Sequence, residues 1–178
     1  VQHNLTYGAA LVAIVLILIL GNLRAALITA FVIPISLLTT FIFMNYFGVS
    51  GNLMSLGALD FGIIIDGAVI VLDNCVRRIS GKREKLKRSL DREEIQNEVI
   101  SATKEIRSAA GFGQLIIIIV FLPIFALSGV EAKMFVPMAA TFVFALASSF
   151  IFSFTTVPAL SGMLLSGKAS RLKSPVMF

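Results

Sequence analysis

Apolar runs of membrane-spanning length recur along the chain and are separated by short polar turns. The runs cover residues 5–20, 25–47, 53–73, 111–127 and 134–165. A helix needs about 20 mainly apolar residues to cross the hydrocarbon core of a bilayer, so each run predicts a transmembrane helix, although the first is slightly short. The pattern therefore predicts an all-α membrane protein with five transmembrane helices.

One segment between the third and fourth runs departs from this pattern. Residues 76–110 hold ten of the chain's Lys and Arg residues, and a second basic stretch forms the tail at 167–178. Within the first segment, Asp91 followed by Glu94 has the spacing of a capping box that opens a helix. Four apolar residues then recur at helical spacing: Ile95, Val99, Ala102 and Ile106. We predict one cytoplasmic amphipathic helix, lying against the membrane surface or the base of the bundle.

The composition supports a membrane protein and excludes several kinds of site. Hydrophobic residues make up 57% of the 178 residues, and the mean hydropathy is +0.95, beyond the range of soluble domains. Cys75 and His3 are the only residues of their types, which excludes an internal disulfide framework and a zinc site built from Cys or His clusters. The first charge, Arg24, follows the first apolar run, whereas a signal peptide has its basic region before that run. We expect the chain to be a piece of a larger protein.

The basic residues predict an orientation. With five spans, fourteen of the fifteen Lys and Arg residues fall on one side of the membrane, and Lys133 alone falls on the other. The side rich in Lys and Arg is normally cytoplasmic, so the N-terminus is predicted outside and the C-terminus inside. The net charge of +5 does not indicate nucleic-acid binding, because the basic residues are not interleaved with aromatic ones. Topology and surface solvation explain the basic segment best, with lipid headgroup binding or partner docking as alternatives.

The third run is unusual because it contains carboxylates. Asp60 and Asp66 lie inside it, and an ionised carboxylate at that depth costs about 2.5–3.5 kcal/mol even on lenient insertion scales. Six residues of helix separate them by ~9 Å along the axis and ~120° around it, so they cannot share one proton directly. Asp73 follows Asp66 by seven residues and lies on nearly the same face. The three carboxylates form a ladder from the middle of the membrane towards the cytoplasm.

A ladder of carboxyl groups can gain and lose protons as its surroundings change, which is what a proton relay in a pump requires. The alternative is that Asp60 and Asp66 are structural and hydrogen-bonded to neighbouring helices. For Asp73, simple solvation at a helix end is an equally strong alternative. Small residues along the same run, including Gly57, Gly62 and Gly67, favour close packing against other helices.

Residues 52–74 (NLMSLGALDFGIIIDGAVIVLDN) resemble the fourth transmembrane helix of the resistance-nodulation-division (RND) efflux pumps. The resemblance is closest to the heavy-metal efflux branch of the cobalt–zinc–cadmium type, and its specific part is DFGIIIDGAV at 60–69. GNLRAALI at 21–28, FGVSGNLMSLG at 47–57 and GVEAKMFVPMA at 129–139 match the family in the same order. The resemblance implies that the five spans are the second to sixth of twelve.

The resemblance also implies a function. Family members are homotrimers of the bacterial inner membrane that exchange protons for cations and join a periplasmic adaptor protein and an outer-membrane channel. The aspartates matching Asp60 and Asp66 carry protons and work with a lysine on a helix of the other half, which this chain lacks. The resemblance implies no cofactor and no resident metal site in this chain; a divalent ion of the zinc, cobalt, cadmium or nickel class is the substrate.

Several positions refine the resemblance. Asp60 distinguishes the divalent-cation type from the copper–silver type, which has an apolar residue there. The family commonly has Glu where this chain has Asp73, so the role of Asp73 is the least certain of the three. Ser108 stands where a Pro is common, and Gln114 where a Glu is common.

Three hypotheses follow. The leading one is a proton/cation antiporter, a transporter with no catalytic residues. An intramembrane aspartyl protease also needs two membrane aspartates, but it needs them close enough to share a water, and the GxGD pattern of such proteases is missing. The third hypothesis is that the isolated 178 residues form an inert membrane scaffold that transports nothing.

Overall fold

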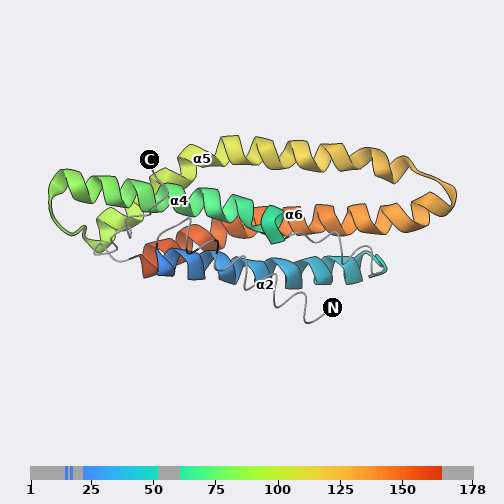
Figure 1. The fold of residues 1–178 in the computed structure, drawn as a ribbon, viewed down its shortest axis with the longest axis horizontal. Coiled ribbons are helices and arrows are strands. Elements are labelled where there is room, and N and C mark those ends of the chain that lie inside the picture. The colour runs from blue at the N-terminus through green and yellow to red at the C-terminus, as the bar shows by residue number, and fades with distance from the viewer. Residues whose placement is uncertain (1–14, 16, 18–21, 52–60, 166–178) are drawn as a thin grey trace.

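The computed structural model describes residues 15, 17, 22–51 and 61–165, and in this part of the chain every regular element is a helix (Figure 1). The elements are α2 (Leu23–Tyr46), α4 (Phe61–Leu86), α5 (Arg92–Phe121), the short 3-10 helix η1 (Leu122–Ala126) and α6 (Gly129–Leu164). The predicted all-α class is confirmed. The first predicted run (apart from residues 15 and 17), the basic tail and Asp60 lie outside the described residues.

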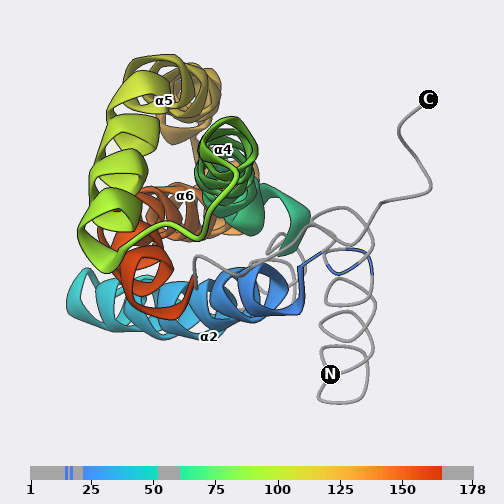
Figure 2. The ribbon, with the colours of Figure 1, turned by 90° about the vertical axis from the view of Figure 1, so that its left-hand side faces the viewer.

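The long helices run roughly along the longest axis of the molecule (Figure 1). Helices α2 and α6 pack in opposite directions, as do α4 and α5, and α6 contacts each of the other three (Figures 1 and 2). The chain reverses between α5 and α6 at η1, which contains Pro123. Helix α6 is therefore the element on which α2, α4 and α5 are assembled.

Helices α2 and α6 contact each other, and both bury small and hydroxyl-bearing residues. Thr29, Ser36 and Thr40 of α2 are buried, as are Ser148, Ser153 and several alanines of α6. The hydroxyls of Thr29 and Thr40 donate to carbonyl oxygens one turn earlier in their own helix, at 3.2 and 2.7 Å. Small residues allow helix backbones to approach closely, which is the usual way that helices associate in a membrane.

The basic segment is organised differently from the prediction. Helix α4 does not end near residue 73 but continues to Leu86, and α5 runs without a break from Arg92 into the fourth predicted span. The only interruption between them is the connection at 87–91, where Lys87 adopts a left-handed φ of 51°. The segment 76–110 is thus the tip of a helical hairpin, and no separate amphipathic helix precedes the fourth span.

The residues used to predict a helix in this segment behave as expected. A capping box joins Asp91 and Glu94 at the start of α5, where the Glu94 carboxylate accepts a hydrogen bond of 2.9 Å from the Asp91 N–H. Ile95, Val99 and Ala102 are buried in the same core as residues of α2, α4 and α6. Of the two predicted positions, the apolar face of this helix therefore occupies the base of the bundle.

Two other boundaries also bear on the predictions. Helix α2 begins and ends within two residues of the predicted run. Helix α6 begins at Gly129, five residues earlier than predicted, so Glu131 and Lys133 lie in its first turns rather than in a connecting turn. The turn between η1 and α6 is correspondingly short.

Three helical stretches among the described residues have the length and composition to cross a membrane: α2, α5 continued by η1, and α6. Their most apolar windows are 39%, 0% and 44% buried, respectively, so no residue in the apolar window of α5 is buried. Residues such as Phe112 (66% exposed) and Val120 (65%) would face water in a soluble protein. The exposed surface is that of a membrane protein.

Candidate functional site

Helix α4 has one buried and one exposed face. Its buried apolar residues follow helical spacing and pack into the core: Ile64, Ile65, Ala68, Val71, Leu72, Cys75, Val76 and Ile79. Asp66 is exposed and Asp73 is half-buried, and they lie on the other face. Seven residues make nearly two turns, so these two carboxylates lie on one face about 10 Å apart along the axis. The structure thus brings Asp66 and Asp73 onto one face, while Asp60 lies beyond the described part.

Beneath this carboxylate face, α4 and α6 approach closely at Gly67. A Cβ added at Gly67 would lie 3.1 Å from the Ser153 hydroxyl oxygen, tighter than almost all real contacts of this kind. The Ser149 hydroxyl donates a hydrogen bond to the backbone carbonyl of Ile64 on α4. The predicted role of small residues in close packing is confirmed at Gly67.

Helix α5 joins the same contact through Gln114. The Gln114 Nε2 donates to the backbone carbonyl of Leu146 on α6 at 3.2 Å. Its Oε1 would lie 3.7 Å from a Cβ at Gly67, so the amide sits where α4, α5 and α6 meet. Gln114, one of the three positions noted as departing from the pattern of the family that the chain resembles, is therefore part of the helix junction next to Asp66.

About two turns beyond Asp66, Asn74 is a buried polar link between α4 and α5. Its Nδ2 donates to the carbonyl oxygen of Ala102 at 3.1 Å and to Glu105 Oε2 at 3.4 Å, and its Oδ1 accepts from Arg77 at 2.8 Å. The side chain is 3% exposed, so these bonds satisfy a buried amide that would otherwise be costly. The residue next to Asp73 thus fixes α4 to α5.

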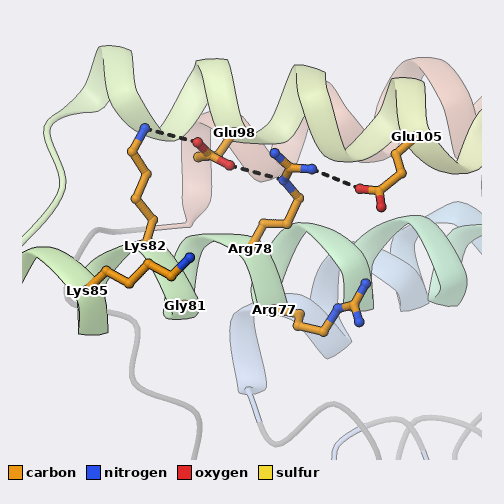
Figure 3. A pocket seen from close by; sticks show the side chains of 7 residues that line it. All are labelled: Arg77, Arg78, Gly81, Lys82, Lys85, Glu98 and Glu105. Carbon is orange, nitrogen blue, oxygen red and sulfur yellow. Dashed lines mark hydrogen bonds and ion pairs between the residues drawn. The ribbon is translucent and has the colours of Figure 1, made fainter.

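Beyond Asn74, ion pairs connect the two arms of the hairpin (Figure 3). Arg78 donates to Glu98 at 3.1 Å and to Glu105 at 2.8 Å, and Lys82 pairs with Glu98 at 2.9 Å. At the tip, Arg88 and Glu94 pair at 2.7 Å. Glu98 receives two cations and is only 16% exposed, so it is the best-shielded member of the cluster.

These contacts shift the ionisation of the groups in the hairpin. Hydrogen bonds from Lys82 and then Arg78 lower the pKa of Glu98, although partial burial opposes them. The hydrogen bond from Arg78, followed by that from Asn74, lowers the pKa of Glu105. The two glutamates in turn raise the pKa of Arg78. All three groups therefore remain charged at neutral pH.

Sequence analysis missed Asn74, Glu98 and Glu105. Asn74 falls on the buried side of α4, where a polar residue in an apolar pattern is a signal for a cross-helix hydrogen bond. Glu98 and Glu105 are seven residues apart and flank the apolar face of α5, as a cross-helix ion-pair row would require. No sequence signal indicates which cation each carboxylate meets.

The described residues contain no group of three or more His, Cys, Asp or Glu side chains placed to hold a metal ion. The described carboxylates Glu94, Glu98 and Glu105 of α5 are instead paired with cations. The described site therefore consists of two carboxylates, Asp66 and Asp73, on one face of α4. The close junction of α4, α5 and α6 at Gly67 holds this part of α4 in place.

Comparison with known proteins identifies the context of this site. The whole chain, residues 1–178, matches the AcrB/AcrD/AcrF family. It is 53% identical over 177 residues to the cobalt-zinc-cadmium resistance protein CzcA of Cupriavidus metallidurans, covering 99% of this chain and 17% of that protein. It is 48% identical over 177 residues to the nickel and cobalt resistance protein CnrA of the same organism, covering 99% and 16%. The chain therefore spans about a sixth of the length of these relatives.

A solved structure agrees with the sequence matches. The fold superposes on the crystal structure of a heavy metal efflux pump with a TM-score of 0.73 and 36% identity, covering 92% of this chain and 15% of that one. Both the sequence and the helix arrangement are thus shared with metal-resistance transporters. The chain belongs to the AcrB/AcrD/AcrF family and, among these RND transporters, to the heavy-metal efflux branch.

Proposed function

We propose that this chain is the part of a proton-driven efflux pump that carries protons across the membrane, with Asp60 and Asp66 as proton carriers and Asp73 as a third, less certain member. The observation that carries the proposal is the position of Asp66 and Asp73 on one face of α4, opposite the face that packs in the core. Carboxylates in an otherwise apolar membrane helix are costly and mark ion or proton pathways.

The substrate we propose is a divalent cation of the zinc, cobalt, cadmium and nickel class. This rests on the relatives, which are named for resistance to these metals. Because proton entry drives cation exit, the transporter is an antiporter whose energy source is the proton gradient. No cofactor is needed beyond that gradient.

The whole pump is proposed to be a homotrimer in the lipid of the bacterial inner membrane, joined to a periplasmic adaptor protein and an outer-membrane channel. A lysine on a helix outside this chain completes the relay by facing the carboxylates of α4. The N-terminus of this chain lies on the periplasmic side and its C-terminus in the cytoplasm. Because the chain is about a sixth of its relatives' length, the isolated 178 residues form a membrane scaffold without transport.

The test is Asp66→Asn in the full-length pump, which keeps the size of the side chain and removes its ionisation. We expect metal resistance of the host cells to fall to the level of cells without the pump. Glu84→Gln makes the same chemical change at an exposed position of the same helix and should leave resistance unchanged. Full resistance with Asp66→Asn at equal protein level would reject the assignment.

A further inference from the structure

An open cavity of about 460 Å³ lies between the two arms of the hairpin, beyond the end of the apolar core (Figure 3). Its lining comes from both arms: Arg77, Arg78, Gly81, Lys82 and Lys85 of α4, and Glu98 and Glu105 of α5. Four cations face two carboxylates, so the cavity has a formal excess of two positive charges. This excess favours an anionic ligand.

Gly81 lies among these cations and leaves the surface of α4 uncovered inside the cavity. Arg77 and Lys85 lie one helical turn before and after it, and a Cβ added at Gly81 would meet nothing within 4 Å. Glycine is unfavourable in a helix interior, and here no packing against a neighbour requires it. Because Gly81 has no side chain, the helix surface there stays open, one turn from Arg77 and one turn from Lys85.

The four cations of the cavity are used in two ways. Arg78 and Lys82 reach across to the carboxylates of α5, whereas Arg77 and Lys85 lie along α4 (Figure 3). Arg77 donates one hydrogen bond, to Asn74. Lys85 forms no hydrogen bond or ion pair with any other described residue. Lys85, whose ammonium points towards Gly81, therefore has donors left for a ligand seated there, whereas the Arg77 guanidinium points away from Gly81 towards Asn74 (Figure 3).

On α5, the helix face that carries Glu98 and Glu105 in the cavity becomes apolar further along the helix. Steps of seven residues keep nearly the same helix face and lead from Glu98 and Glu105 to Phe112 and Ile119. Phe112 is 66% exposed and Ile119 is 51% exposed. A ligand with an anionic head and an apolar tail matches this sequence of surfaces, whereas a free anion would use only its first part.

We propose that the cavity binds the phosphate group of an anionic phospholipid, with the phosphate at Gly81 next to Lys85 and the acyl chains along the exposed face of α5. The site is separate from the proposed proton relay and does not depend on it. Its ligand would tie the hairpin to the lipid on the basic side of the membrane.

The test is a titration of the purified 178-residue chain in detergent, with bound lipid counted by native mass spectrometry. The lipids are phosphatidylglycerol and phosphatidylcholine with identical acyl chains, and inorganic phosphate serves as a competitor. We expect phosphatidylglycerol to bind at least tenfold more tightly, and millimolar phosphate to displace little of it. Lys85→Gln should weaken phosphatidylglycerol binding about fivefold.

Two variants separate a built site from general attraction to a basic surface. Gly81→Leu keeps every charge but covers this open surface of α4, and it should abolish the preference for phosphatidylglycerol. Lys104→Gln removes one exposed charge of α5 outside the cavity and should change binding less than twofold. Circular dichroism verifies that the variants keep their helix content. Should Gly81→Leu unfold the chain, the comparison of Lys85→Gln with Lys104→Gln decides alone.

The proposal is overturned by any of three results. One is an unchanged preference for phosphatidylglycerol in the folded Gly81→Leu variant, which would indicate that the lipid is attracted to the basic surface as a whole. Another is an equal loss of binding in Lys104→Gln and Lys85→Gln. The last is complete displacement of the lipid by millimolar phosphate, which would make this a site for free anions.

Discussion

Two glycines of α4 meet opposite surroundings, although both are in the interior of the same helix. At Gly67 the added Cβ would press on Ser153 of α6, while at Gly81 it would meet open space. The first glycine therefore sets the distance between two membrane helices. The second leaves helix surface uncovered where cations gather.

This contrast predicts unequal effects of the same substitution. Gly67→Leu forces a large side chain into the contact of α4 with α6 and should destabilise the chain by about 1–3 kcal/mol. Gly81→Leu adds a good helix former without a clash and should leave stability equal or raise it by about 0.5–1 kcal/mol. Unfolding of the chain in mixed micelles, followed by circular dichroism, measures both. Equal stability of the two variants would show that Gly67 does not set the helix distance.

Individual residues also show where sequence reasoning stops. That Asp66 and Asp73 share a face follows from helix geometry and required no structure. That Gln114 lies at a junction of three helices, and that Asn74 is bonded to Ala102 and Glu105, depends on how α4 and α5 are placed relative to each other. Such placement comes from packing of distant segments, which a local pattern does not encode.

At the scale of elements, the hairpin of α4 and α5 combines a buried apolar seam with ion pairs at its edge. Ile95, Val99 and Ala102 pack in the core, and the row formed by Glu98 and Glu105 holds cations of α4 beside them. Because Glu98 is largely shielded from solvent, its two ion pairs are screened less than surface pairs. The hairpin should therefore respond to pH.

The sign of that response follows from the lowered pKa values of Glu98 and Glu105. A carboxyl group with a lower pKa in the folded than in the unfolded chain stabilises the fold above its unfolded pKa of about 4.3. This stabilisation is lost as the pH falls through the lower folded value. Thermal unfolding of the chain should thus be nearly constant from pH 7 to 5 and shift to lower temperature between pH 4.5 and 3.

Glu98→Gln isolates the contribution of this residue. The variant should lose about 1–3 kcal/mol at pH 7, because hydrogen bonds to charged groups are replaced by weaker ones. It should also show a smaller change in melting temperature between pH 7 and 3. Glu84→Gln, at an exposed position of α4, serves as the control, and the same pH profile in both variants would contradict this account.

The element boundaries show which sequence signals report on structure. The capping box at Asp91 and the helical spacing that follows it located the start of α5 correctly. The predicted third run ends at residue 73, yet α4 continues to Leu86, because hydropathy reports the surroundings of a helix and not its length. Lys87, with its left-handed φ, marks the real end of α4, and a lysine gives no warning of that conformation.

At the scale of the whole molecule, charge is distributed unequally along the bundle. The described cations of α4, the first half of α5 and Arg24 gather at one end, where Arg24 donates to the Leu164 carbonyl at the end of α6. Lys133 lies at the start of α6, at the opposite end (Figure 1). The charges from which the orientation is predicted thus lie at opposite ends of the bundle, and the orientation itself stays a prediction.

Cysteine labelling of the chain in bacterial membranes tests the orientation. Lys133→Cys should react with a membrane-impermeant maleimide in right-side-out vesicles, and Lys104→Cys should react only in inverted vesicles. The native Cys75 is buried, so the unmodified chain should show little labelling and serves as background. Labelling of both cysteines from the same side would contradict the predicted topology.

The unbroken course of α5 has a mechanical consequence. Its 30 residues form a rod about 45 Å long, from the capped end at Asp91 to the turn at η1. A rod without a joint cannot tilt at one end alone. A displacement where α5 meets α6 is therefore carried to the ion pairs of the hairpin, and a ligand that holds the hairpin also restrains the helix within the membrane. Helix α5 therefore acts as a lever. The contact at Gln114 lies near the end of α5 that leads into η1.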